Sequence, residues 1–138
     1  MSFDKICYRQ NNCFFFEYPL FKQFANKETY PFIIQLITST IDSILAENEL
    51  FDSHLSFKMI TIGDIDKHLG FWRELTNVLK NRYKSKLNVC YLYDMPSFFA
   101  RCYDVGKVFI DKDTQTKIQF IKKDVEDKIK DTTTVKTA

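Results

Sequence analysis

The chain alternates short strand-like runs with longer helix-like runs, and this order constrains its fold more than any other feature. Apolar and aromatic runs predict strands at 13–18, 55–62 and 87–93, and a further strand at 6–9 pairs with the first across Asn11-Asn12. Strands alternating with helices in this way imply right-handed βαβ crossovers. We therefore expect an α/β fold with a mixed, largely parallel sheet in a single compact domain.

Two helices separate these strands. The first is predicted from about 30 to 49, where isoleucines recur at three- and four-residue steps, Pro31 lies in the first turn, and Asn26 or Thr29 is the cap. The second is predicted from 66 to about 83, with one apolar face. The residues of that face are Leu69, Trp72, Leu75, Val78 and Leu79.

Boundaries are set by turn residues and by polarity. Gly63-Asp64 closes the strand at 55–62, and Pro96 ends the strand at 87–93 before a third helix at 97–109. A short further element follows at 113–121. After Ile121 the chain is polar and rich in threonine, so we expect a domain at 1–121 and a loosely ordered tail at 122–138.

Composition excludes several classes of function. With 20 basic and 18 acidic residues the net charge is +2, which gives no polycationic surface for nucleic acid. The four cysteines form no C-x-x-C pair and only two histidines are present, so no metal site is expected. The beginning of the chain does not have the order of a signal peptide, and the sequence predicts a cytoplasmic protein of a reducing compartment.

Catalytic motifs are also missing. Ser97 is not part of a G-x-S-x-G element, and Gly63 stands alone, so no glycine-rich phosphate loop is present. The acidic residues match no known carboxylate pair and are typical of a solvated loop face. We expect a protein that is not an enzyme and has no cofactor.

The helix predicted at 97–110 has an unusually wide apolar surface. Its polar positions are Arg101, Asp104 and Lys107, at three-residue steps along one face. Two interpretations are open. The helix is sandwiched between the sheet and another element, or it covers an apolar cavity that a lipid fills.

Three motifs follow one another in this half of the chain. NRYKSKL at 81–87 is similar to an N-x-Y-P-x-x-L element, with lysine in place of proline, and DMPSFF at 94–99 to an N-x-P-x-x-F element. KVFID at 107–111, with Thr114 and Lys117-Ile118, matches a K-P-F-L, acidic turn, threonine and K-I series. In this order and spacing, 69–121 resembles the CRAL-TRIO family of lipid-binding domains, which includes phosphatidylinositol and α-tocopherol transfer proteins.

The resemblance implies a lipid-binding or lipid-transfer module with a lid helix over its pocket. The lipid-binding residues it implies are Phe98, Phe99, Cys102, Tyr103, Phe109, Ile110, Lys117 and Ile118. Lys117 takes the place of the lysine that contacts phosphoinositide headgroups, whereas Ser85 replaces a glutamate found there in some members. The implied partners are a hydrophobic small molecule or phospholipid and, transiently, a membrane surface.

The chain also departs from the family pattern. Compared with full-length members it looks like a shortened form, without the preceding helical region and the last strand and helix, and Ile60 replaces an aspartate. An alternative function is therefore a protein-interaction scaffold with a collapsed pocket, which docks on a membrane-associated protein or a small GTPase. Dimerisation through the sheet edge is compatible with both functions.

A basic cluster precedes the strand at 87–93. Its members are Lys80, Arg82, Lys84 and Lys86. Two interpretations are open: a solvated helix end with cations at the negative end of the helix dipole, or a contact with an anionic membrane.

Overall fold

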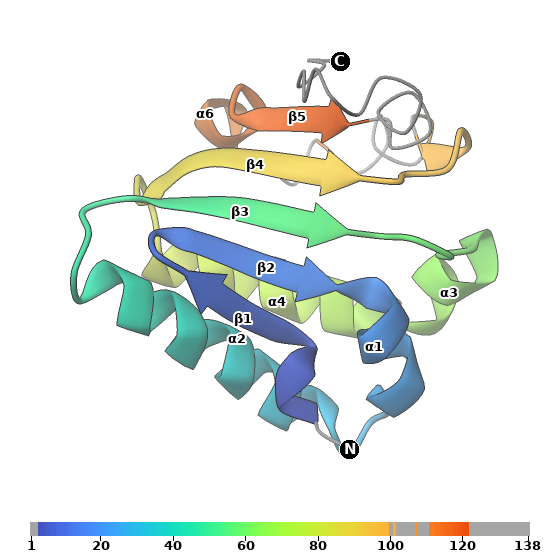
Figure 1. Cartoon of the computed structure of the whole chain (residues 1–138). Helices are drawn as coiled ribbons and strands as arrows, with labels where there is room; N and C mark the ends of the chain where they lie inside the picture. Colours follow the sequence, from blue (N-terminus) through green and yellow to red (C-terminus); the bar gives the residue numbers. More distant parts are fainter. Residues whose placement is uncertain (1–2, 100, 102–106, 108–110, 122–138) are drawn as a thin grey trace, which may run out of the picture.

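The computed structural model describes residues 3–99, 101, 107 and 111–121. A five-stranded sheet forms the centre of this part of the molecule, in the order β1-β2-β3-β4-β5 (Figure 1). The strands are β1 (Cys7–Gln10), β2 (Cys13–Glu17), β3 (Phe51–Ser56), β4 (Leu87–Tyr93) and β5 (Ile118–Ile121). Only β1 and β2 pair antiparallel, and the other three pairings are parallel. The predicted α/β class with a largely parallel sheet is confirmed, as is the hairpin across Asn11-Asn12.

The helices connect successive strands. They are α1 (Tyr18–Phe24), α2 (Tyr30–Leu45), α3 (Ile62–Lys67), α4 (Leu69–Arg82) and α6 (Lys112–Gln115), and a single 3-10 turn, η1 (Phe3–Lys5), precedes β1. Successive crossovers of the same hand along a sheet place their helices on the same face. Accordingly, α2 and α4 both lie on one face of the sheet (Figure 1).

The hydrophobic core lies between α2 and this face. Because isoleucines recur at helical spacing on α2, they form one buried stripe, and the aromatic side chains of β2 and β3 pack against it. The buried members of the stripe are Ile33, Ile34, Ile37, Ile41 and Ile44. The helix was correctly predicted, although it ends at Leu45 rather than near Glu49. Packing, not intrinsic propensity, holds this β-branched helix.

The start of α2 uses both predicted capping residues, in different ways. Thr29 occupies the N-cap position, but its side chain makes no capping hydrogen bond. The carboxamide oxygen of Asn26 instead accepts hydrogen bonds from the backbone N–H groups of Glu28 (2.8 Å) and Thr29 (3.0 Å). Asn26 thus shapes the turn that leads into the helix.

The predicted strand at 55–62 is wrong in its bounds. The strand begins at Phe51 and ends at Ser56, because its register with β2 runs from Cys13↔Asp52 to Glu17↔Ser56 and β2 ends there. Gly63 does not close a strand but lies inside α3. Thr61 and Asp64 begin that helix with a capping box, in which each side chain bonds the backbone N–H of the other.

The single helix predicted from 66 to 83 is two helices, α3 and α4. His68 lies between them, buried, with Nδ1 2.6 Å from the hydroxyl oxygen of Tyr30 on α2. This contact fixes the break where the chain changes direction. Leu69, which the apolar pattern placed on the inner face, is 37% solvent-exposed.

Beyond β4 the structure resolves the short predicted element at 113–121 into α6 and β5. Asp111 caps α6, and β5 adds a parallel edge to β4 through pairs from Cys90↔Ile118 to Tyr93↔Ile121. The helix predicted at 97–109 lies mostly outside the described residues, as does the whole tail at 122–138. The division into a domain at 1–121 and a tail therefore stays a prediction.

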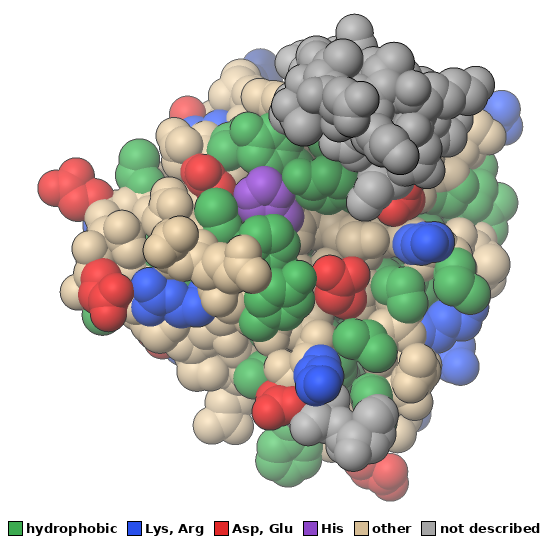
Figure 2. All heavy atoms as spheres, viewed as in Figure 1, with side chains coloured by type: hydrophobic (Ala, Val, Ile, Leu, Met, Phe, Trp, Pro, Cys, Tyr) green, Lys and Arg blue, Asp and Glu red, His purple; other side chains and the backbone are tan. Residues whose placement is uncertain are grey.

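The second face of the sheet carries a row of rings. Tyr8, Phe15, His54 and Tyr91 are successive register partners on β1 to β4, and neighbouring ring centroids lie 4.8–5.0 Å apart. Figure 2 shows hydrophobic side chains gathered around a histidine on this face. Such cross-strand pairs reinforce strand pairing. Burial lowers the pKa of His54, so the ring in the row is neutral at pH 7.

Asp42 links the two long helices. Its Oδ2 accepts a hydrogen bond from Arg82 Nη2 at 2.7 Å, and its Oδ1 lies 2.7 Å from the hydroxyl oxygen of Tyr83, which donates to it. Burial and the Asp42 carboxylate raise the pKa of Tyr83, which keeps the hydroxyl protonated as a donor. The end of α4 is thereby held against the last turn of α2.

Substitution of two adjacent residues of α2 tests the packing of the core. Ile33 is completely buried, whereas Phe32 is 60% exposed. We expect Ile33→Ala to lower the free energy of unfolding by about 2–5 kcal/mol, because it leaves a cavity, and Phe32→Ala to change it by less than about 0.5 kcal/mol. Urea denaturation measures both. Equal effects of the two substitutions would contradict the packing described.

Candidate apolar binding cavity

A cavity of about 920 Å³ lies between the helix-covered face of the sheet and α4. Its floor comes from the strands, one wall from α4, and part of its back from Ile37 and Ile41 of α2. The floor residues are Phe14, Phe16, Phe51, Ser53, Leu55, Cys90 and Ile118. The volume lies within the range of about 300–1,000 Å³ that is typical of small-molecule sites.

The floor owes its shape to one row of register partners. Phe14, Ser53, Cys90 and Ile118 pair in succession across β2, β3, β4 and β5, so their side chains emerge on the same face. The two central members, Ser53 and Cys90, are small. The sheet therefore leaves a hollow at its middle, where larger side chains would meet the helices.

The wall is a stripe of α4. Trp72, Leu75 and Leu79 recur at spacings of three and four residues, so they share one face of the helix and line the cavity together. The aromatic ring of Trp72 also packs on Phe57, which follows β3 and closes the same end of the cavity. This end and the floor are apolar.

The opposite end is polar. Lys80 and Lys84, near the end of α4, and Asp111, Asp113 and Lys117, around α6, all line it. Lys117 Nζ lies 3.1 Å from Oδ2 of Asp113. The Thr114 hydroxyl donates to Asp111 at 2.8 Å, and this bond, together with the charge of Lys80, lowers the pKa of Asp111. We call this set of five charged residues the polar mouth.

The cavity offers little for catalysis. Burial raises the pKa of the Cys90 thiol to about 12, so the thiol stays protonated and is a poor nucleophile. Neither His54, in the ring row, nor His68, between α3 and α4, lines the cavity. No cluster of three or more histidine, cysteine, aspartate or glutamate residues suited to a metal occurs in the described part of the chain.

The structure separates the lipid-binding residues predicted from the sequence. Lys117 and Ile118 line the cavity. Phe98 and Phe99 are half-buried but do not line it, and the ring of Phe99 lies 6.0 Å from that of Phe120 on β5. Cys102, Tyr103, Phe109 and Ile110 lie outside the described residues.

The basic cluster is also divided. Lys80 and Lys84 belong to the polar mouth, whereas Arg82 forms the ion pair with Asp42. Lys86 is exposed and does not line the cavity. All four side chains are exposed, and their contact with an anionic membrane stays a prediction.

Apart from Ile118, the sequence did not predict the residues of the floor and the wall. The stripe of Trp72, Leu75 and Leu79 was visible in the sequence, but a core helix gives the same pattern. Ser53 carried no usable signal, because the strand was predicted to begin after it. Only the register shows that Ser53 and Cys90 are neighbours.

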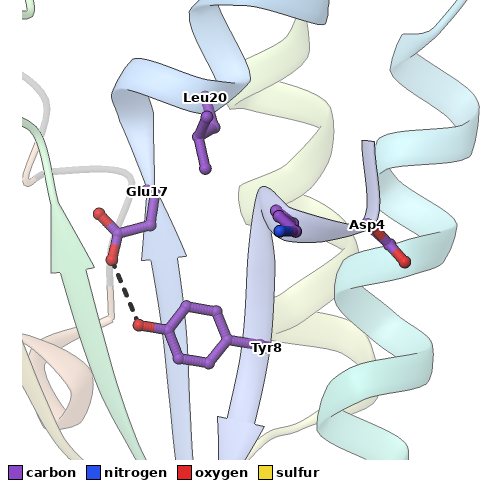
Figure 3. Close-up of a pocket in the computed structure, with 5 residues that line it drawn as sticks. Asp4, Tyr8, Glu17 and Leu20 are labelled. Atoms are coloured by element: carbon purple, nitrogen blue, oxygen red, sulfur yellow. Dashed lines mark hydrogen bonds between the residues drawn. The ribbon is translucent and has the colours of Figure 1, made fainter. Parts of the chain in front are cut away.

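A smaller and more open depression lies on the other side of β2. It is lined by Asp4, Lys5, Tyr8, Glu17 and Leu20. Figure 3 shows Tyr8 and Glu17 facing each other across neighbouring strands, where the Tyr8 hydroxyl donates to Glu17 at 3.4 Å. Leu20 from α1 borders it above. With its two facing polar groups bonded to each other, the depression is a weaker candidate than the cavity.

None of the helices in the described part of the chain has both the length and the hydropathy needed to cross a membrane.

Comparison with known proteins supports the architecture. The crystal structure of Sfh5 superposes with a TM-score of 0.69 at 15% sequence identity, over 83% of this chain and 45% of that one. The chain thus spans less than half the length of this structural neighbour, and the likeness shows the fold alone. No curated protein matches the chain. The family model described as CRAL/TRIO domain matches residues 8–134. The chain belongs to the CRAL/TRIO domain family.

Proposed function

We propose that the chain binds one lipid-sized hydrophobic ligand in the cavity under α4. The observation that carries the proposal is the largely apolar hollow over Ser53 and Cys90, which has the polar mouth at one end. Membership of the CRAL/TRIO domain family favours a lipid-binding or lipid-transfer module over other uses of such a cavity.

The free energy of transfer from water favours occupation of the cavity by the acyl chain of a lipid. Each methylene group transferred from water into an apolar site contributes about 0.8 kcal/mol, so an acyl chain of ten or more carbons provides a large gross driving force. An empty cavity of this size, by contrast, forfeits the contacts that its lining side chains would otherwise make. A ligand therefore completes the packing between the sheet and α4.

The polar mouth supports an amphipathic ligand with an anionic group. Lys80, Lys84 and Lys117 contribute three positive charges, and Asp111 and Asp113 contribute two negative charges. Asp113 is paired with Lys117, so Lys80 and Lys84 are the cations best placed to meet a phosphate or carboxylate. The role that the family resemblance gives to Lys117 in headgroup binding stays a prediction.

The roles of the other residues that the family resemblance implied also stay predictions. A lid formed by 97–110, with Phe98, Phe99, Cys102, Tyr103, Phe109 and Ile110 over the ligand, is a prediction that needs experimental evidence. The position of Phe99 beside Phe120 is compatible with it, since Phe120 and the floor residue Ile118 lie two residues apart on β5.

The alternative function, a protein-interaction scaffold with a collapsed pocket, is less well supported. A pocket filled by its own side chains would leave no hollow between the sheet and α4, whereas about 920 Å³ is open there. Binding to a small GTPase, to another membrane-associated protein or to a second copy has no specific observation in its favour.

Narrowing the cavity tests the proposal. We expect Ser53→Phe, on the floor, and Leu75→Trp, on the wall, each to lower the amount of bound phospholipid at least about tenfold, because the added rings occupy the space of several methylene groups. Retention of a fluorescent phospholipid by the protein after exposure to donor vesicles measures the effect.

Asn77→Trp is the matched control, because Asn77 lies on the exposed side of the same helix. It is expected to leave binding unchanged. Thermal unfolding of all three variants checks that they remain folded. Wild-type binding by folded Ser53→Phe and Leu75→Trp variants would overturn the assignment of the cavity.

The polar mouth makes a separate prediction about headgroup charge. We expect Lys80→Glu and Lys84→Glu each to reduce the preference for phosphatidylglycerol over phosphatidylcholine by about fivefold, since a cation near an anionic lipid group contributes about 1 kcal/mol. Competition between the two lipids for the protein measures this ratio. Lys86→Glu, outside the cavity, should not change it, and an equal effect there would show that only the overall charge matters.

A further inference from the structure

The connection between β3 and α3 presents apolar side chains to solvent. Met59 is 67% exposed, which is the largest value for a large apolar residue among those described, and Ile62 is 60% exposed. The side chain of Ile60, between them in the sequence, is buried. Side chains along this connection therefore alternate between solvent and the interior. We call the segment from Phe57 to Ile62, which exposes the side chains of Lys58, Met59 and Ile62, the Met59 turn. Figure 1 shows the neighbouring α3 at the end of the molecule toward which β3 and β4 point.

Met59 has a backbone conformation that residues with a Cβ rarely adopt. The N–H of Ile60 donates to the carbonyl oxygen of Phe57 at 3.1 Å, and Met59 has a φ of 72°. A hydrogen-bonded turn with positive φ at its third residue is a type II turn, in which glycine is favoured at that residue. A side chain with a Cβ is strained there. Glycine would give the same turn without the strain, but it would not present an apolar side chain.

The rest of the connection is firmly anchored. Thr61 Oγ1 accepts from the N–H of Asp64 at 3.0 Å, and Oδ2 of Asp64 accepts from the N–H of Thr61 at 3.2 Å. Asp64 also pairs with Lys22 of α1 at 3.1 Å. Met59 and Ile62 therefore project from a fixed support, and ordering them for a contact costs little entropy.

The same turn closes the apolar end of the cavity. Phe57, its first residue, lines the cavity together with Trp72, whereas Met59, two residues later, faces solvent. The polar mouth lies at the other end. Lys84 lies shortly before the start of β4, whereas the Met59 turn follows the end of β3, and the two strands are parallel.

We propose that the Met59 turn is the part of the molecule that inserts into the interface of a lipid bilayer. The proposal rests on the proposed lipid-binding function. Two protruding side chains on a convex turn suit the shallow, non-specific insertion that a bilayer accepts, whereas a folded protein partner would need a groove or a broader apolar surface. Lys58 before Met59 and Lys67 at the end of α3 are both exposed and can reach lipid phosphates.

The proposal fixes how the cavity is oriented relative to the membrane. With the Met59 turn in the bilayer, the apolar end of the cavity faces the membrane and the polar mouth faces away from it.

Co-sedimentation with vesicles tests this assignment. The probe is phosphatidylcholine vesicles containing a minority of phosphatidylserine. We expect Met59→Ser and Ile62→Ser each to weaken vesicle binding about tenfold, as loss of a partly inserted side chain predicts. Phe32→Ser is the matched control, because Phe32 is equally exposed, at 60%, but lies on α2. It should bind as the unsubstituted chain does.

Met59→Gly separates the proposal from a purely structural role. Relief of the left-handed strain should raise the thermal midpoint by a few degrees, while vesicle binding falls about as far as in Met59→Ser. A variant that is more stable but binds less cannot be explained by unfolding.

Three outcomes would overturn the proposal: no association of the unsubstituted chain with these vesicles, equal weakening by Phe32→Ser, or unchanged binding by Met59→Ser and Ile62→Ser. Self-association that depends on Met59 in gel filtration, with unchanged vesicle binding, would assign the turn to a protein contact instead. The phospholipid content of each purified variant is measured in parallel. If the variants retain lipid but bind membranes independently of the turn, this inference alone is refuted. If no preparation contains lipid, the proposed function is refuted.

Discussion

The parallel pairing of β3 with β2 on one side and β4 on the other is the interaction on which the rest of the structure depends. It sets Ser53 between Phe14 and Cys90 on the helix-covered face. The same register sets His54 between Phe15 and Tyr91 on the second face. A shift of one residue would exchange these faces, bringing polar side chains into the cavity and exposing its floor. Both the hollow and the ring row are therefore consequences of one alignment.

Local patterns were sufficient to predict several elements. The isoleucines of α2 repeat at helical spacing over about three turns. The hairpin at Asn11-Asn12 joins two short runs that contain aromatic residues, so both elements can be predicted from residues that are close in the sequence. The end of β3 was harder to predict, because LSFKMITI at 55–62 has the composition of a strand. The pairing with β2 ends at Ser56, and the capping pair of Thr61 and Asp64 begins a helix instead.

The cavity could not be predicted from local patterns. Its floor depends on two small residues, Ser53 and Cys90, that are 37 positions apart in the sequence and meet only through strand register. Its wall was visible as an apolar stripe, but a stripe that packs on a core and one that lines a cavity look alike. The family motifs predicted a lipid pocket in this half of the chain, and two of the residues that they implied, Lys117 and Ile118, line the cavity. They did not point to α4.

The two ends of the cavity differ in polarity. Charged side chains surround the end of the cavity that lies near the start of β4. The other end of the cavity lies near the end of β3 and is closed by the Met59 turn, which has Met59 on its outer side. This polarity matches that of an amphipathic lipid, and it is consistent with a domain that moves lipid between a membrane and its own interior. Backbone strain at Met59 and the small side chain of Ser53 both lower stability, and the proposed function accounts for both.

Native mass spectrometry of the unsubstituted chain, after incubation with phospholipid vesicles and removal of the vesicles, tests the central claim most directly. The account predicts a complex with one phospholipid per chain, which is lost when Ser53 is replaced by phenylalanine. A chain that keeps only its own mass under these conditions, while remaining folded, would contradict it.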